Sequence, residues 1–254
     1  WKQLTQKKTL KLPKLIGHRG VKDLCPENTI ESITKAFDLG LTYVEIDVKI
    51  SKDEVPILLH DDTLDRTTNG KGLAVNYVYD DIKKLDAGKF FYNKNTNIFV
   101  PKLEDILNLC IKNRGNLNIE LKPNKNYENL NVKKIIEITN KINEVEVFFS
   151  SFDLQSIKEL NKLLPKSIKS FLIDDFNLYN LDDLIDIANK YQISICGLNI
   201  DIISEDIVKK IKKEKILITA YSNSSISYPQ INDMFKMGID SFFVDDPTEI
   251  INIV

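Results

Sequence analysis

Eight short runs of β-forming residues alternate with amphipathic helical patterns along almost the whole chain of 254 residues. Strands that alternate with helices are joined by helical crossovers, and such strands lie parallel in one sheet. Eight strand–helix units in about 250 residues are typical of a TIM (β/α)8 barrel. The sequence therefore predicts an α/β fold of this kind, with strands at residues 15–18, 43–48, 117–121, 146–150, 169–173, 194–197, 216–220 and 241–244.

No Gly/Ser-rich linker divides the chain, so we expect residues 1–254 to form a single domain. The segment from about residue 61 to residue 101 is rich in turn-forming residues and too long for an ordinary connection. Segments of this length are usually functional or flexible. We expect it to be an insertion that covers one mouth of the barrel.

A ninth strand-like run, residues 55–59, follows the second strand after too few residues for a parallel crossover. We expect it to return antiparallel as a β-hairpin that extends the second strand and turns at the sequence SKDE. A turn centred in the middle of SKDE would place His60 opposite Glu45, and a turn centred one residue later would place it opposite Asp47. Either register brings a histidine against a carboxylate.

The first helix has recognisable end signals. Asn28 is expected to cap its N-terminus, with Glu31 bonding back in a variant of the capping box. Gly40 then ends the helical pattern.

The composition narrows the class of protein. The 35 basic and 37 acidic residues nearly balance, which argues against a nucleic-acid-binding protein. No apolar run reaches the roughly 18 to 20 residues that a transmembrane segment requires. Three widely spaced cysteines favour neither a disulfide framework nor a zinc site, and they indicate a reducing, cytoplasmic compartment. The first residue is Trp1 rather than Met, so a periplasmic or secreted location stays open; the sequence does not decide the oligomeric state.

Two acids in the sequence VEIDV, Glu45 and Asp47, are two residues apart on a strand and therefore share one face. Carboxylates that face a barrel interior are costly to bury without partners. A divalent cation would offset that cost, and ligands that are all oxygens suggest Mg²⁺ or Ca²⁺. The alternative is a set of salt bridges with interior lysine or arginine side chains.

The sequence NIELK repeats this pattern on a later strand. Glu120 and Lys122 share a face at its carboxyl end, where active sites of TIM barrels are built. Glu120 could be a third metal ligand, and Lys122 could hold an anionic oxygen as a point charge. An interior Glu–Lys pair would explain the same two residues.

The only two histidines, His18 and His60, also lie at or just beyond the ends of strand-like runs, and Arg19 directly follows the first of them. In a barrel these ends converge on one pocket. A cation, basic residues and two histidines fit phosphoryl chemistry, in which one imidazole takes a proton and the other donates one. Each residue alone could be structural, but a glycosidase would leave the histidines without a role.

A series of motifs then runs along the chain in order: GHRG, PENTIES, VEIDV, LLHDDTLDRTTNGKG, LDAGKFF, VPKLEDIL, NIELKP, FSSFD and GIDSFFVDDP. This series resembles the motifs of glycerophosphodiester phosphodiesterases from about Leu15 to Pro247. The resemblance implies a TIM barrel whose insertion follows the HD motif. It also implies hydrolysis of small-molecule glycerophosphodiesters, such as glycerophosphocholine or glycerophosphoethanolamine, to glycerol 3-phosphate and an alcohol.

The resemblance also implies roles for particular residues. His18 and His60 would be the acid/base pair, and Arg19 and Lys122 would contact the phosphate. One divalent cation, Ca²⁺ or Mg²⁺, would be held by Glu45, Asp47 and Glu120. Glu27 and Asn28 also fall in a family motif, but only Asn28 has a predicted role, the helix cap described above.

One motif departs from the family. Many members carry WTVN after the seventh strand, where this chain has AYSN. If Asn223 keeps its register, the Trp position is Ala220, and the wall of the substrate pocket is altered. Phe152 could supply part of an apolar wall, although a core phenylalanine is the simpler interpretation.

Two other functions compete with this one. A lysophospholipase D or sphingomyelinase D-like enzyme would share the barrel, the cation and the histidines. An exposed apolar rim would favour such an enzyme, and the sequence KFFYNKNTNIF could supply that rim. A catalytically inactive barrel that binds phosphodiesters or a protein would be expected to lack a histidine or an acid, and this chain has them all.

Overall fold

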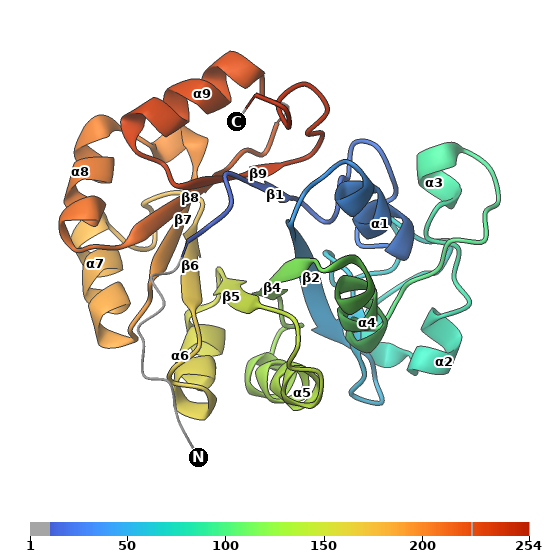
Figure 1. Ribbon diagram of the computed structural model, residues 1–254. Coiled ribbons are helices and arrows are strands. Elements are labelled where there is room, and N and C mark those ends of the chain that lie inside the picture. Colours follow the sequence, from blue (N-terminus) through green and yellow to red (C-terminus); the bar gives the residue numbers. More distant parts are fainter. Residues whose placement is uncertain (1–10, 225, 254) are drawn as a thin grey trace.

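Eight parallel strands close into a barrel in the computed structural model, which describes residues 11–224 and 226–253. The order around the barrel is β1-β9-β8-β7-β6-β5-β4-β2, and β1 pairs with β2 to close it (Figure 1). The strands are β1 Leu15–Gly17, β2 Tyr43–Ile50, β4 Asn116–Leu121, β5 Val147–Ser151, β6 Lys169–Ile173, β7 Ile195–Asn199, β8 Leu217–Tyr221 and β9 Ser241–Val244. The TIM barrel is confirmed, and each bound lies within two residues of its prediction.

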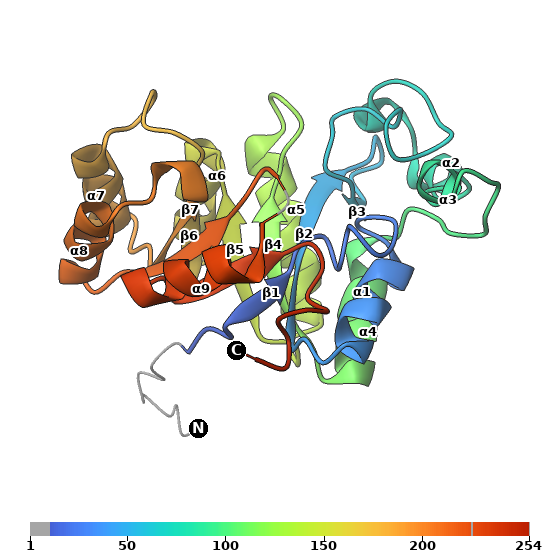
Figure 2. The same cartoon turned by 90° about the horizontal axis from the view of Figure 1, so that it is seen from above.

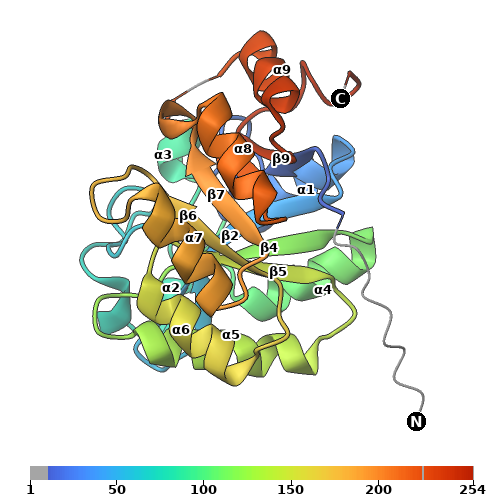
Figure 3. The same cartoon turned by 90° about the vertical axis from the view of Figure 1, so that its left-hand side faces the viewer.

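Helices surround the strands, as Figure 3 shows for the side that carries α7 and α8. They are α1 Ile30–Asp38, α4 Leu103–Asn113, α5 Glu128–Lys141, α6 Leu154–Leu163, α7 Leu181–Lys190, α8 Glu205–Lys213 and α9 Tyr228–Met237, with a 3₁₀ helix η2 at Ile200–Ile202. Side chains alternate along β2. Val44, Ile46 and Val48 are fully buried in the layer between strands and helices, so the carboxylates between them face the barrel interior.

The barrel interior is apolar at its amino-terminal end and polar at the other. Ile16, Tyr43, Phe148, Ile195 and Phe243 form a cluster inside the barrel. Above this cluster the inward side chains become polar, and they include Asn118, whose amide bonds the Ser150 hydroxyl at 2.9 Å. The polar end is the one at which TIM-barrel sites are built.

The first helix begins one residue later than its sequence suggested. Thr29 is the N-cap, and its hydroxyl accepts the Ser32 N–H at 3.1 Å. The prediction for Asn28 was wrong, because its backbone is left-handed (φ 57°) and its side chain bonds Asp47 instead. Gly40, with φ 98°, follows the helix as predicted.

The hairpin is present, but with a register that lies between the two predicted ones. Strand β3 (Pro56–Leu58) returns antiparallel to β2, with Lys49 opposite Ile57. The turn is therefore centred on Asp53, so both predicted registers were wrong. The Leu59 N–H still donates to the Asp47 carbonyl at 3.1 Å, after which His60 leaves the ladder.

The segment that follows β3 packs beside α1 and α4 (Figures 1 and 2). It contains η1 Ala74–Asn76, α2 Tyr79–Ile82 and α3 Lys89–Tyr92. It has a small apolar cluster of its own, to which Ile57 of β3 contributes. The Tyr92 hydroxyl reaches the Glu31 carboxylate at 2.7 Å and so joins α3 to α1. In the described ranges, no helix has both the length and the apolar composition of a bilayer-crossing segment.

Two leucines on α6 test the packing of the helical layer. Leu160 is fully buried, whereas Leu163 is 40% exposed. Leu160→Ala should lower the free energy of unfolding by about 2–5 kcal/mol, because it leaves a cavity between helix and sheet. The control Leu163→Ala should change it by about 1 kcal/mol or less. Urea unfolding followed by circular dichroism measures both, and equal losses would contradict this placement of α6.

Candidate active site

A cavity opens at the carboxyl ends of the strands. It is lined by side chains from β2, β4, β5, β6, β8 and β9 and from the segments that follow several strands: His18, Arg19, Glu45, His60, Asn118, Glu120, Lys122, Ser150, Phe152, Leu172, Tyr221, Asn223 and Phe243. All predicted site residues except Asp47 line it, and Asp47 lies directly beneath, 1% exposed. The fold thus brings the whole predicted set together.

Three buried carboxylates form the floor of this cavity. Each of Glu45, Asp47 and Glu120 offers an oxygen within 4.8 Å of the others, and the register of β2 and β4 places Asp47 opposite Glu120. Burial, together with the charges of Asp47 and Glu120, raises the pKa of Glu45 well above its ordinary value. Burial likewise raises the pKa of Glu120. The cluster therefore carries more negative charge than its surroundings compensate.

The carboxylates differ in the partners that they have. Lys122 Nζ lies 2.8 Å from Glu120 and 3.5 Å from Asp47, and Arg19 Nε lies 3.3 Å from Asp47. Burial opposes ionisation of Asp47, but the Lys122 and Arg19 charges lower its pKa below the usual range. Glu45 Oε1 is buried and has no hydrogen-bond partner among the described residues. Salt bridges thus account for two of the acids, and the orphaned oxygen of the third is suited to a cation.

The GHRG turn fixes His18 and Arg19 against the first helix. Gly20 has φ 87°, and a β-carbon there would come within 2.3 Å of the Ser32 hydroxyl. That hydroxyl accepts the Val21 N–H at 2.8 Å and donates to the Arg19 carbonyl at 3.0 Å. The Arg19 N–H in turn donates to a Glu45 oxygen at 2.9 Å. The motif is therefore a tight turn bonded to both β2 and α1.

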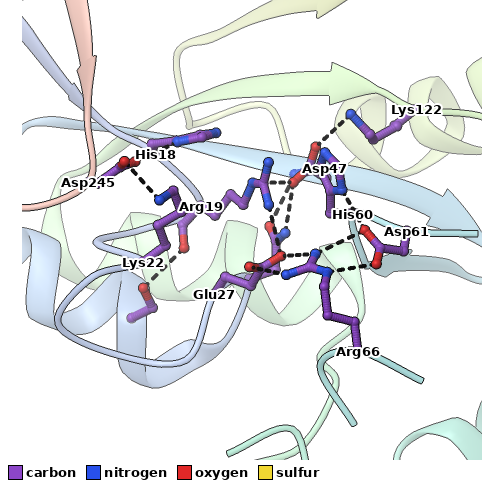
Figure 4. Close-up of polar contacts among 12 residues, drawn as sticks. His18, Arg19, Lys22, Glu27, Asp47, His60, Asp61, Arg66, Lys122 and Asp245 are labelled. Atoms are coloured by element: carbon purple, nitrogen blue, oxygen red, sulfur yellow. Dashed lines mark hydrogen bonds and ion pairs between the residues drawn. The ribbon is translucent and has the colours of Figure 1, made fainter. Parts of the chain in front are cut away.

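Each histidine is held by a carboxylate at the same ring nitrogen (Figure 4). His18 Nδ1 lies 2.7 Å from Asp245, and His60 Nδ1 lies 2.7 Å from Asp61. A carboxylate only accepts, so in the neutral ring Nδ1 carries the proton and Nε2 is left with a lone pair. Lys22 Nζ contacts the second oxygen of Asp245 at 2.8 Å. Both imidazoles are therefore oriented with Nε2 free for proton transfer.

The environment of His60 also affects its protonation. Burial lowers its pKa, and the nearby Arg19 and Lys122 charges lower it further, although Asp47 acts in the opposite direction. The imidazole of His60 is thus mostly neutral at neutral pH, the form that can accept a proton.

Sequence reasoning missed the two carboxylates that orient the histidines. Asp61 lies in LLHDD and Asp245 in FVDDP, two of the motifs already noted. No spacing rule points to Asp245, however, because it lies 227 residues from His18. It also missed Arg66, which bonds both Asp61 and Glu27.

Aromatic side chains form one wall of the cavity. Phe152 is 40% exposed, and its ring meets Tyr221 edge-on with centroids 5.8 Å apart. Lys122 Nζ lies 5.6 Å from the Phe152 centroid. Ala220, the residue at the predicted Trp position, is fully buried in the core. The next residue, Tyr221, is the one whose aromatic ring lines the cavity. The Tyr221 hydroxyl bonds Asp174 at 3.2 Å, which fixes the ring at the rim.

Known proteins are similar to this chain in sequence and in fold. The model of the glycerophosphoryl diester phosphodiesterase family matches residues 18–249. The chain belongs to this family. It is 31% identical over 241 residues to a glycerophosphodiester phosphodiesterase of Caldanaerobacter subterraneus subsp. tengcongensis, a match that covers 94% of this chain and 97% of the relative. A second, from Bacillus altitudinis, is 30% identical over 246 residues, 95% of this chain and 98% of the relative.

Solved structures agree with this membership. A phosphodiesterase of Oleispira antarctica, solved in complex with the product sn-glycerol-3-phosphate, superimposes with a TM-score of 0.87 at 26% identity. The match covers 94% of this chain and 95% of that one. The resemblance found in the sequence is confirmed: the chain is a glycerophosphodiester phosphodiesterase, a hydrolase of phosphoric diesters.

Glu45→Gln tests the carboxylate cluster through pH. Because its pKa is raised by folding, Glu45 holds its proton to a higher pH in the folded state than in the unfolded chain. Ionisation of Glu45 therefore costs stability in the metal-free protein as the pH rises through that pKa. The variant should be more stable than the wild type at about pH 8 in EDTA, and the difference should shrink toward acid pH. Thermal unfolding across this range measures it.

The same variant tests cation binding. Added Ca²⁺ or Mg²⁺ should raise the melting temperature of the wild type, because a ligand that binds only the folded state stabilises it. The shift should be smaller for Glu45→Gln. Calorimetric titration of both proteins provides the affinities, and an unchanged affinity in the variant would remove Glu45 from the ligand set.

Proposed function

We propose that this enzyme hydrolyses small, water-soluble glycerophosphodiesters, such as glycerophosphocholine and glycerophosphoethanolamine, to glycerol 3-phosphate and an alcohol. The observation that carries the proposal is that both oriented histidines, two basic side chains and three carboxylates meet at one cavity. The likeness to a phosphodiesterase solved with sn-glycerol-3-phosphate supports this choice of product.

Glu45, Asp47 and Glu120 are proposed to hold one divalent cation, Ca²⁺ or Mg²⁺. All three donors are carboxylate oxygens, which suit either ion. The orphaned Glu45 oxygen and the raised pKa of Glu45 indicate a position that a cation would satisfy. When bound, the cation supplies positive charge that neutralises phosphate oxygens.

Arg19 and Lys122 are proposed to bind the phosphate. Both basic side chains lie beside the carboxylate cluster and line the cavity. Burial opposes the charge of Lys122, but Glu120 and Asp47 raise its pKa, so its side chain is a positively charged ammonium. The Arg19 guanidinium can present its remaining N–H groups to an anionic oxygen.

His18 and His60 are proposed to carry the protons. The neutral Nε2 of His60 takes a proton from the attacking water, whose oxygen forms the new bond to phosphorus. Protonated at Nε2, His18 donates to the leaving alkoxide as the old P–O bond breaks. Asp61 and Asp245 hold the two rings in these orientations through Nδ1. After this step His60 holds the proton and His18 is neutral, and proton exchange with water restores both for the next turnover.

Phe152 and Tyr221 are proposed to form the apolar side of the substrate pocket. The two rings meet edge-on, and both line the cavity. A glycerol or head-group carbon chain could pack there while Lys122, beside the Phe152 ring, holds the phosphate. We also propose that residues 1–254 form one catalytic domain, with the segment at about 61–101 as an insertion beside its mouth.

A lipid substrate is the second candidate, and a specific observation favours it. Phe90, Phe91 and Phe99, all in the proposed insertion, are 42–55% exposed. A lysophospholipase D or sphingomyelinase D-like enzyme could use such side chains to contact an acyl chain. The Lys and Asn residues among them make the soluble diester the preferred substrate.

Glycerol 3-phosphate release from glycerophosphocholine is the primary test. Release should stop in EDTA and return with Ca²⁺ or Mg²⁺. His18→Ala and His60→Ala should each lower kcat by about 10²- to 10⁴-fold, because each removes a proton-transfer group. Asp233→Asn, on the exposed side of α9, is the control and should leave kcat unchanged. Normal turnover in either histidine variant would exclude that residue from the mechanism.

Phe152→Ala and Phe90→Ala distinguish the two substrate classes. Phe152→Ala should raise KM for glycerophosphocholine about 5- to 30-fold, the equivalent of about 1–2 kcal/mol of lost apolar contact. Phe90→Ala should leave that KM unchanged. If the wild type instead prefers lysophosphatidylcholine and Phe90→Ala impairs only that reaction, the lipid function is the correct one.

A further inference from the structure

One arginine from the segment after β3 bonds two carboxylates at once (Figure 4). Arg66 Nε and Nη2 donate to the two oxygens of Asp61 at 2.7 and 2.9 Å. Its Nη1 and Nη2 donate to the two oxygens of Glu27, both at 2.8 Å. Four hydrogen bonds thus converge on a single guanidinium.

Each of these carboxylates holds a residue of the active site. Asp61 accepts from His60 Nδ1 at 2.7 Å. Glu27 accepts from Arg19 Nη1 at 3.0 Å. Arg66 itself does not line the catalytic cavity. It is one contact removed from both an imidazole and a guanidinium that do.

Arginine rather than lysine at position 66 agrees with this geometry. The chain has 32 lysines and only three arginines, and two of those arginines, Arg19 and Arg66, meet at Glu27. A planar guanidinium can bond two carboxylates with parallel pairs of N–H groups, whereas an ammonium acts as a point charge. The third, Arg114, ends helix α4 and is exposed.

We propose that Arg66 is a positioning residue whose guanidinium fixes the His60 imidazole, through Asp61, and the Arg19 side chain, through Glu27, in their working orientations. The inference rests on the proposed function for the roles of His60 and Arg19. Its bonds to Glu27 link the segment after β3 to the loop between β1 and α1.

The contribution of Arg66 to stability is expected to be small. Its side chain is 47% exposed, and exposed ion pairs are weak because water screens them. A purely structural salt bridge would therefore change little when it is removed. A positioning residue would instead change the geometry of His60, and both the imidazole tautomer and the rate report that geometry.

The first experiment reads the tautomer by NMR of the ¹⁵N-labelled protein of residues 1–254. With only two histidines, the imidazole spectrum contains two ring systems. At about pH 8 both rings in the wild type should carry the proton on Nδ1. In Arg66→Ala and Arg66→Lys, His60 should shift to a mixture of tautomers. His18, held by Asp245 and Lys22, should not change and is the internal control.

The second experiment measures glycerophosphocholine hydrolysis. Arg66→Ala should lower kcat about 10- to 100-fold, because a misoriented catalytic group costs rate out of proportion to the displacement. Millimolar methylguanidinium should restore part of kcat, since the vacated site is open to solvent. Arg66→Lys should keep the charge but not the rate. The control Arg114→Ala should match the wild type with and without methylguanidinium.

The outcomes separate this inference from the proposed function. An unshifted His60 tautomer in both Arg66 variants, or wild-type kcat in Arg66→Ala, would overturn the positioning role. If Arg66→Ala does not fold, Arg66→Lys decides by the same two measurements. A wild-type protein that hydrolyses no glycerophosphodiester would refute the proposed function, while the tautomer spectra would still judge whether Arg66 orients His60.

Discussion

The burial of three carboxylates inside one end of a barrel is the constraint on which the rest of the site depends. Glu45, Asp47 and Glu120 share a volume in which each raises the cost of ionising the others. The protein offsets part of that cost with Lys122 and Arg19, which lie against two of the three acids. The negative charge that remains suits a divalent cation. The positive charge of that cation, together with Lys122 and Arg19, would then suit an anionic substrate. One electrostatic imbalance thus favours both ligands.

A second set of carboxylates orients the side chains that line the cavity. Asp245 and Asp61 lie behind the histidines, and Glu27 lies behind Arg19. None of these three lines the cavity. They orient the side chains that do, and they are themselves bonded to further cations. The site is therefore layered: reactive groups face the cavity, and an outer shell of ion pairs, one of which reaches into the segment after β3, determines how those groups point.

The side chains that stabilise the barrel and the side chains of the active site lie at different positions along the barrel axis. The interior at the amino-terminal end is packed with apolar side chains such as Phe148 and Ile195, and a large apolar cluster lies between the strands and the helices. The polar groups are concentrated at the carboxyl ends of the strands. Sufficient apolar burial elsewhere allows this end to keep like charges in proximity, an arrangement that a smaller core would not support.

The sequence by itself determined the barrel and the inward face of its acids, because both follow from short-range periodicity. Alternation along β2 requires Glu45 and Asp47 to share a face, and eight strand–helix units predict one shared mouth. Only the tertiary structure decided the hairpin register, the true partner of Asn28, and the pairing of His18 with Asp245 across 227 residues. Such contacts depend on where the closed barrel places distant strand ends, and no local pattern encodes that distance.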